Sequence, residues 1–304
     1  MSTEPVSPCA IELVGVTKRF GKHVAVQDLT LRIPAGRTLG LIGPNGAGKT
    51  TAIKMLMGLL PMTAGRARVL GIDPAVKPVL LKRAVGYVPE MHFIYRAMRA
   101  AEVIGFCRTF YPTWNNPLCA ELAGRFEIDL HKKVKHLSKG SLAKLALLLA
   151  LVHEPEVLIL DEPMTGLDPL AREEFLEGVV RGLCDRPRTV LFSSHMLSDV
   201  QRMADTIGII HEGRLLACCP TEELLRTTKR IRAVVRDGCT PDRPPEGTIW
   251  QRFERREWLL TVRPFSPATL EYLRGTYPVE NVEVQDLGLE DVFKDYIRGQ
   301  KVQA

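Results

Sequence analysis

The stretch that decides the fold is Gly43-Pro-Asn-Gly-Ala-Gly-Lys-Thr50, which matches the phosphate-loop pattern GxxxxGK[ST]. A short apolar run, residues 39–42, comes directly before it, and residues 51–60 have a helical pattern. A strand, a glycine-rich loop and a helix in this order are the structural context that the pattern requires. The sequence therefore predicts an α/β fold in which the phosphates of a nucleotide bind at the end of a buried strand.

The residues of this loop suit the binding of phosphate. Glycines let backbone N–H groups point into one concave nest, and the following helix adds its positive N-terminal end. We expect Lys49 to reach the β- and γ-phosphates and the Thr50 hydroxyl to bind Mg²⁺. The residues of this segment that we expect to bind ATP are Gly43, Pro44, Asn45, Gly46, Ala47, Gly48, Lys49, Thr50 and Thr51.

A second segment carries two acids. Residues 157–160 are apolar, and Asp161 and Glu162 follow them. Because ligands of α/β proteins bind at the carboxyl ends of the strands, we expect Asp161 to hold Mg²⁺ and Glu162 to act as general base on the attacking water. By itself the pattern fits a strand that ends in two solvated carboxylates equally well. Together with the phosphate loop it favours a nucleotidase.

Composition limits the class of protein. The 304 residues are 45% hydrophobic and 25% charged, which is typical of a folded chain and excludes disorder or collagen. A formal net charge of +6 is too small to indicate nucleic-acid binding. Seven scattered cysteines without a CxxC pair indicate reduced thiols in the cytosol. We find no signal peptide and no apolar run of membrane-spanning length, so we expect any membrane role to use another chain.

The pattern of apolar residues in the sequence changes near residue 228. Before it, short apolar runs alternate with helical patterns, which is typical of a mainly parallel sheet. Beyond it, residues 231–235 and 258–262 are strand-like, and residues 289–297 place their apolar side chains on one helix face. We therefore expect a first domain at residues 1–228 and a small α+β domain at residues 229–304.

Five further segments resemble the motifs of ATP-binding cassette (ABC) ATPases, and they occur in the order of that family. Any one of these motifs is weak alone, but the ordered set is specific. The segments are Phe20, matching the aromatic that stacks on adenine; Tyr87-Val-Pro-Glu90 at the Q-loop; Leu137-Ser-Lys-Gly-Ser141, similar to the LSGGQ signature; Gly166-Leu-Asp-Pro169 at the D-loop; and Ser193-Ser-His195 at the switch-histidine loop.

The resemblance implies both a fold and a site shared between subunits. The implied fold is a P-loop ATPase core with a helical signature subdomain and an N-terminal antiparallel β subdomain. ATP would lie between two subunits arranged head to tail, with Ser138 and Gly140 of one subunit on the γ-phosphate bound to the other. His195 would contact the γ-phosphate, and Asp168 would link the two sites across the dimer.

Two departures from the family pattern concern the site. Glu90 stands where most cassettes have glutamine, and we expect it to be a Mg²⁺ ligand that adds negative charge beside the triphosphate. Lys139 and Ser141 replace the first glycine and the glutamine of the signature, while Ser138 and Gly140 remain. We therefore expect an ATP-dependent dimer, either of two copies of this chain or with a second cassette subunit.

The segment Asp286-Leu-Gly-Leu-Glu-Asp-Val-Phe293 resembles the tails of ATPase subunits from ABC-2-type exporters, although packing of an amphipathic helix on its own sheet explains the apolar stripe equally well. The resemblance implies an ATP-hydrolysing subunit that drives a separate permease, at the cytoplasmic face of the inner membrane. We expect residues 81–109 to receive that permease. The alternative is a soluble cassette ATPase that acts as an assembly scaffold, as in iron–sulfur assembly.

Replacing Lys49 by alanine should remove nucleotide affinity as well as turnover, because Lys49 is the only side-chain cation of the loop. Equilibrium binding of a fluorescent ATP analogue to the purified variant measures this. Affinity equal to that of the unsubstituted chain would contradict the assignment of residues 43–50 as a phosphate loop.

Overall fold

The computed structural model describes residues 9–92, 94–184, 188–236 and 239–303. The chain divides into two compact units, Met1–Cys218 and Cys219–Ala304. The division lies within strand β9 (Arg214–Pro220), whereas the change in the pattern of apolar residues places a boundary near residue 228. The six cysteines whose side chains are described form no disulfide bond, and the side chain of Cys184 lies outside the described residues.

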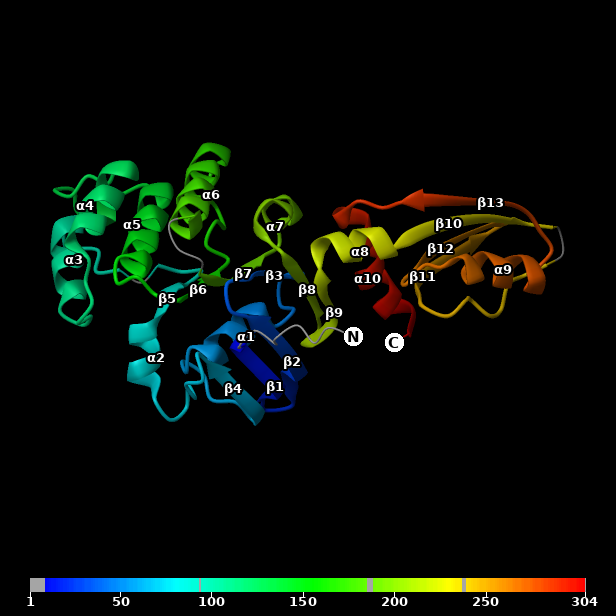
Figure 1. The fold of residues 1–304 in the computed structure, drawn as a ribbon, viewed down its shortest axis with the longest axis horizontal. Coiled ribbons are helices and arrows are strands. Elements are labelled where there is room, and N and C mark those ends of the chain that lie inside the picture. The colour runs from blue at the N-terminus through cyan, green and yellow to red at the C-terminus, as the bar shows by residue number, and fades with distance from the viewer. Residues whose placement is uncertain (1–8, 93, 185–187, 237–238, 304) are drawn as a thin grey trace, which may run out of the picture. The chain divides into compact units, whose positions relative to one another are not determined.

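A six-stranded sheet with the order β5-β6-β7-β3-β8-β9 lies at the centre of the first unit (Figure 1). The four pairs β5–β6, β6–β7, β7–β3 and β3–β8 are parallel, so the mainly parallel sheet is confirmed. Parallel strands buried on both faces are continuous apolar runs in sequence, and every residue of β3, β6 and β7 is buried. The strands are β3 (Thr38–Ile42), β5 (Val85–Val88), β6 (Val157–Asp161), β7 (Thr189–Ser194), β8 (Thr206–His211) and β9.

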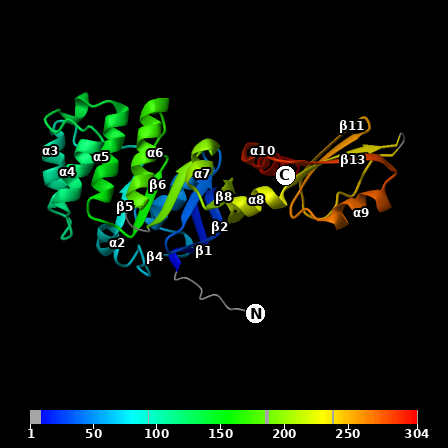
Figure 2. The same cartoon turned by 45° about the horizontal axis from the view of Figure 1, so that its top comes forward.

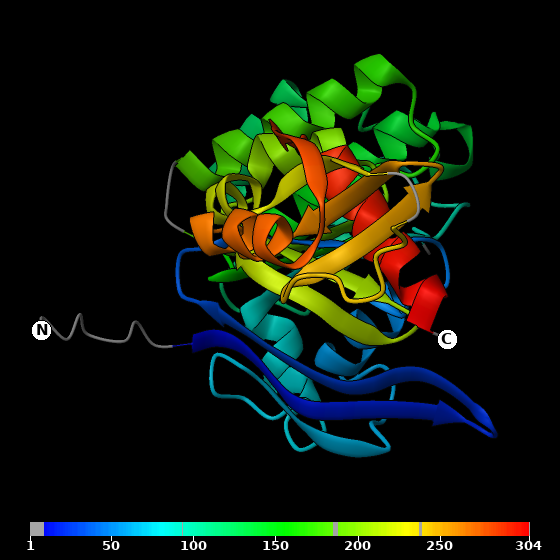
Figure 3. The same cartoon turned by 90° about the vertical axis from the view of Figure 1, so that its right-hand side faces the viewer.

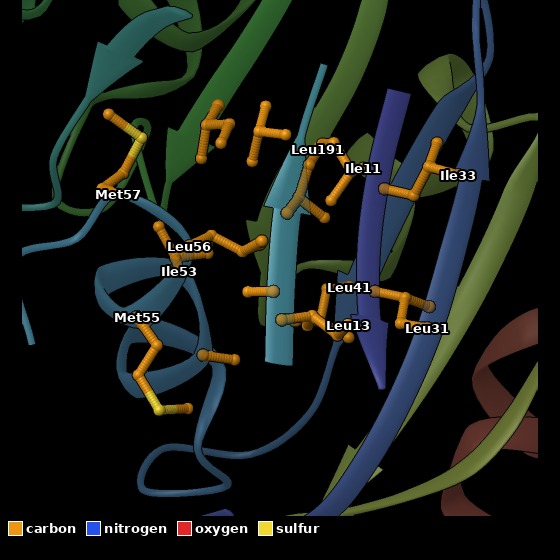
Figure 4. Close-up of a cluster of buried hydrophobic side chains, with 14 of the residues drawn as sticks. Ile11, Leu13, Leu31, Ile33, Leu41, Ile53, Met55, Leu56, Met57 and Leu191 are labelled. Atoms are coloured by element: carbon orange, nitrogen blue, oxygen red, sulfur yellow. The ribbon is translucent and has the colours of Figure 1, made fainter. Parts of the chain in front are cut away.

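A smaller antiparallel sheet lies beside the parallel one. Its central strand β1 (Cys9–Phe20) pairs with β2 (His23–Pro34) and with β4 (Ala64–Val69). Helix α1 (Lys49–Leu56) shares one hydrophobic core with both sheets: Ile53 and Leu56 belong to the same cluster as strand residues of β1 and β3 (Figure 4). This core holds β3 and α1 in place, and these two elements flank the phosphate loop.

A helical subdomain is inserted between β5 and β6. Helices α3 (Ala100–Arg108), α4 (Asn116–Arg125) and α5 (Lys139–Leu151) lie together there (Figures 1 and 2), which confirms the predicted subdomain. Helix α6 (Pro169–Cys184) packs against α5. No helix in the described part of the chain is long and apolar enough to cross a membrane. The remaining helices of this unit are α2 (Pro78–Ala84), η1 (Val134–His136) and α7 (Leu197–Met203).

The second unit is an antiparallel sheet of order β11-β12-β10-β13 with helices packed on it, as the sequence predicted (Figure 3). Side chains alternate between the two faces of a strand. Ile231 and Leu260 form a core with Leu273 of α9, whereas Arg230 and Thr261 face α10. The elements are α8 (Thr221–Thr227), β10 (Lys229–Val235), β11 (Thr248–Glu254), β12 (Glu257–Val262), α9 (Pro267–Thr276), β13 (Val279–Asp286) and α10 (Leu289–Gln303).

Helix α10 contains most of the segment that resembles exporter tails. Leu289 and Val292 of its apolar stripe are buried. Asp295 on the same helix is also buried, pairs with the Arg230 guanidinium and accepts a 2.6 Å hydrogen bond from the Thr261 hydroxyl. Packing within its own unit therefore accounts for the apolar stripe of this helix.

Replacing Asp295 by alanine should lower the free energy of unfolding of the second unit by about 3–5 kcal/mol, because it leaves the Arg230 guanidinium without its buried partner. Glu290→Ala on the same helix is the matched control: its ion pair with Lys294 is exposed, so its loss should matter little. Urea unfolding followed by tryptophan fluorescence measures both variants. Equal losses in the two would contradict the importance given to the buried pair.

Candidate nucleotide-binding site

The loop between β3 and α1 needs glycine at three positions, because a Cβ at Gly43 would lie 2.3 Å from the carbonyl oxygen of Ile210. Gly46 and Gly48 have φ angles of +80° and +105°, a region that residues with side chains rarely adopt. A Cβ at Gly48 would also lie 2.6 Å from the carbonyl oxygen of Ala25. The glycines of the pattern therefore determine the path of the loop, which ends where Lys49 begins α1.

A cavity of about 670 Å³ lies against this loop, a volume within the range of small-molecule sites. It brings together residues of the antiparallel sheet and residues that directly follow strands of the parallel sheet. Three of its lining residues, His23, Ala25 and Thr165, carry no motif and were not expected from the sequence. The other lining residues are Phe20, Asn45, Gly46, Ala47, Gly48, Lys49, Thr50, Thr51, Glu90, Glu162 and His195, all of them singled out above.

The Lys49 ammonium is buried, with a 5% exposed side chain, and joins the loop to the second acid. Its Nζ donates to the carbonyl oxygens of Gly43 at 2.6 Å and Pro44 at 3.1 Å. The third contact of Nζ is an ion pair with Glu162 Oε1 at 3.1 Å. An ammonium has three donors, and here each has an oxygen partner.

Asp161 ends β6, and its two carboxylate oxygens differ in their surroundings. Oδ1 accepts hydrogen bonds from the hydroxyls of Thr50 at 3.0 Å and Ser193 at 2.9 Å. Oδ2 is buried and has no hydrogen-bond partner in the described part of the chain. Burial raises the pKa of this carboxyl, and the two hydroxyls partly oppose the increase. A buried oxygen without a partner is suited to a cation.

The residues at this point fit Mg²⁺. This ion takes oxygen ligands and is usually held by one or two carboxylates together with substrate phosphates. Thr50, Asp161 and Glu90 supply one hydroxyl and two carboxylates, and Glu90 is near enough to Asp161 to raise the pKa of that group. Within the described residues, no group of three or more His, Cys, Asp or Glu could hold a metal by itself. The hydroxyl and two carboxylates suit an ion that substrate phosphates also bind, and Mg²⁺ binding here stays a prediction.

Glu162 has an unusual backbone and a well-defined side chain. Its φ of +47° is rare outside glycine, and such strained residues are common at functional sites. Oε2 lies 2.6 Å from His195 Nδ1 and accepts a 3.0 Å hydrogen bond from the Thr165 hydroxyl. Burial raises the pKa of the carboxyl, but the His195 hydrogen bond and the charge of Lys49 outweigh burial and lower it overall. Glu162 is thus ionised at neutral pH, as a general base must be.

Phe20 lies at the end of β1, where its ring lines the cavity and remains exposed. The Lys18 ammonium is 4.9 Å from the centroid of this ring. An exposed aromatic face beside a phosphate loop offers a surface on which a nucleotide base can stack. Phe20 therefore lines the same cavity as the phosphate loop, and its contact with adenine stays a prediction.

Ser138, Gly140 and Asp168 do not line the cavity of their own chain. The exposed Ser138 caps α5: its Oγ accepts the N–H of Ser141 at 3.0 Å. Gly140 is buried, and a Cβ there would lie 2.8 Å from the Cβ of Ala171 on α6. Asp168 accepts the N–H of the same Ala171 at 2.9 Å. The signature and D-loop segments therefore meet each other, away from the phosphate loop.

Comparison with known proteins identifies the family. The family described as "ABC transporter" matches residues 26–165. Nod factor export ATP-binding protein I of Rhizobium johnstonii is 35% identical over 218 residues, which are 70% of each protein. The bacitracin transport ATP-binding protein BcrA of Enterococcus faecalis is 30% identical over 310 residues, covering 95% of this chain and 96% of that protein.

The chain belongs to the ABC transporter ATP-binding proteins. This is a family of ATP-hydrolysing proteins, and the predicted resemblance is confirmed. A third relative, an ABC transporter ATP-binding protein of Synechocystis, is 34% identical over 228 residues, which span 71% of this chain and 62% of that protein. A solved ATP-binding subunit of an ABC transporter is 28% identical with a TM-score of 0.65, over 71% of this chain and 92% of that one.

Replacing Glu162 by glutamine should preserve ATP binding and reduce turnover by ~10²–10⁴-fold, because the base is lost while the amide keeps the size of the side chain. Thr165→Val, which removes only one hydrogen bond to the same carboxylate, should reduce turnover much less. Phosphate release and binding of a fluorescent ATP analogue measure the two effects separately. Turnover of Glu162→Gln near that of the unsubstituted ABC protein would show that another residue is the base.

Proposed function

We propose that this chain is the ATP-hydrolysing subunit of an ABC exporter that drives a separate membrane permease. The observation that carries the proposal is the contact network of Glu162, which pairs with Lys49 and His195 beside the phosphate loop. Glu162, Lys49 and His195 line a single cavity, which supports their proposed roles as base, phosphate-binding cation and γ-phosphate contact. This arrangement suits the attack of water on a bound γ-phosphate.

ATP would bind with its phosphates on residues 43–51 and its base on Phe20. Thr50, Asp161 and Glu90 would hold Mg²⁺, which when bound neutralises charge on the β- and γ-phosphates. The Lys49 ammonium would exchange its contact with Glu162 for phosphate oxygens. Released in this way, the Glu162 carboxylate can accept a proton from water, and His195 can turn toward the γ-phosphate.

A second subunit would complete the site. Ser138, Gly140 and Asp168 meet on one side of α5 and α6, and none of them lines the cavity of its own chain. A helix N-terminus with an exposed serine can bind an anion that another subunit presents. We infer that these residues contact the ATP held by the second subunit, either another copy of this chain or a different cassette.

The permease would dock on the aromatic patch, which we define as Tyr95, Phe106 and Phe110. All three side chains are exposed. Phe106 packs edge-to-face on Tyr95 and Phe110, with ring centroids 5.5 and 5.1 Å apart. Exposed apolar clusters of this kind commonly mark interaction surfaces. The patch lies mostly within residues 81–109, and docking there would hold the chain at the cytoplasmic face of the membrane.

The names of the relatives favour export over the alternative of a soluble assembly scaffold. One is a Nod factor export protein, and another, which matches over nearly the whole chain, is a bacitracin transport protein. Both carry the ATP-binding role in transport. These names support transport as the function of this chain.

Dimer formation with ATP tests the shared site. Glu162→Gln with ATP and Mg²⁺ should form a dimer, because a ligand bound only by the closed dimer stabilises that dimer by mass action. Ser138→Arg in this background should remain monomeric while its own phosphate loop still binds ATP. Light scattering at high protein concentration measures the mass, alone and mixed with a second cassette subunit.

Gly105→Arg is the matched control, because it adds the same cation to an exposed site of the helical subdomain where nothing lies within 4 Å. This control should dimerise like its Glu162→Gln parent. A dimer of Ser138→Arg as stable as that of the control would show that residues 137–141 do not contact the γ-phosphate. A monomer under every condition would overturn the shared site.

A further inference from the structure

Ser193 is a buried serine that touches both acids of the site. Its side chain has no exposed surface at the end of β7. The hydroxyl donates to Asp161 Oδ1 at 2.9 Å and accepts the backbone N–H of Glu162 at 2.9 Å. We propose that Ser193 is a positioning residue that orients the metal ligand and the general base together. The proposal rests on the function proposed above.

The sheet register places Ser193 beside the first acid. Strands β6 and β7 are parallel, and Asp161 is the register partner of Ser193. Neighbouring residues in register project to the same face of a sheet. The contact between hydroxyl and carboxylate therefore follows from the backbone, with no adjustment of a flexible loop.

For Asp161, the two hydroxyls that donate to Oδ1 determine where Oδ2 lies. Thr50 and Ser193 both donate to Oδ1, which fixes the rotation of the carboxylate about its last bond. Oδ2 is then held in one place, buried and without a partner in the described structure. Hydrogen bonds that orient a metal ligand typically strengthen metal affinity 10–100-fold. Ser193 thus prepares Oδ2 for Mg²⁺ before the ion arrives.

For Glu162, Ser193 acts on the backbone. The φ of +47° is costly for a residue with a side chain and persists only where surrounding contacts impose it. The hydrogen bond from the Glu162 N–H to the buried Ser193 hydroxyl is one such contact. It holds the backbone from which the carboxylate reaches Lys49 and His195.

The next residue, Ser194, provides a natural comparison. It is also buried on β7, but its hydroxyl accepts the N–H of Met196 at 2.9 Å and lies 3.3 Å from the carbonyl oxygen of the same residue. Neither of these contacts involves Asp161 or Glu162. Two adjacent serines of equal size therefore differ in whether they touch Asp161 and Glu162.

The test measures how much Mg²⁺ strengthens nucleotide binding. In the Glu162→Gln background, which prevents turnover, a fluorescent ATP analogue is titrated with Mg²⁺ and with EDTA. Adding Ser193→Ala should reduce the gain from Mg²⁺ by about 10-fold or more and leave binding in EDTA unchanged. Ser194→Ala should keep the full gain. In the otherwise unsubstituted chain, Ser193→Ala should also lower kcat while KM for ATP at saturating Mg²⁺ stays nearly constant.

Two further variants keep the test decisive. Ser193→Cys fills the same space with a weak hydrogen-bond donor and should lose the gain even if the alanine variant folds poorly. Ser193→Thr retains the hydroxyl and should show the full gain in nucleotide affinity from Mg²⁺. An unchanged gain in the alanine and cysteine variants, or an equal loss in Ser194→Ala, would overturn the role of Ser193 while leaving the proposed ATPase intact. If Mg²⁺ did not strengthen nucleotide binding in the Glu162→Gln parent, both the role of Ser193 and the proposed ATPase function would be overturned.

Discussion

The rest of the site depends on the contacts of the buried Lys49 ammonium. A buried charge is strongly unfavourable unless it is paired, and here the Gly43 and Pro44 carbonyls and the Glu162 carboxylate meet its three donors. The loop can direct these carbonyls toward Lys49 only because Gly46 and Gly48 adopt positive φ angles. One ion pair thereby joins two motifs that are far apart in the sequence.

The parallel sheet brings the remaining groups to the same edge. Strand β6 ends in Asp161 and is followed by Glu162, and the neighbouring β7 carries Ser193 and leads to His195. Carboxyl ends of parallel strands meet at one edge, which is where ligands of α/β proteins bind. The chemistry therefore depends on strand register.

Motifs with fixed spacing could be predicted, and contacts set by register could not. The phosphate loop, the acid strand and the order of the ABC motifs led to the correct family and parallel sheet. No pattern distinguishes Ser193 from Ser194, because only the pairing of β6 with β7 decides which hydroxyl faces the acids. Thr165 likewise has no motif; its bond to Glu162 depends on the turn that follows the strained residue.

An experimental structure of the full chain with a non-hydrolysable ATP analogue and Mg²⁺ would show directly whether this cavity holds the triphosphate. We expect Lys49 Nζ to leave Glu162 and bind β- and γ-phosphate oxygens, with the ion beside Asp161 Oδ2. Glu162 would then face the γ-phosphate without its lysine partner. A nucleotide bound elsewhere, with the Lys49–Glu162 ion pair intact, would show that this cavity does not hold the triphosphate.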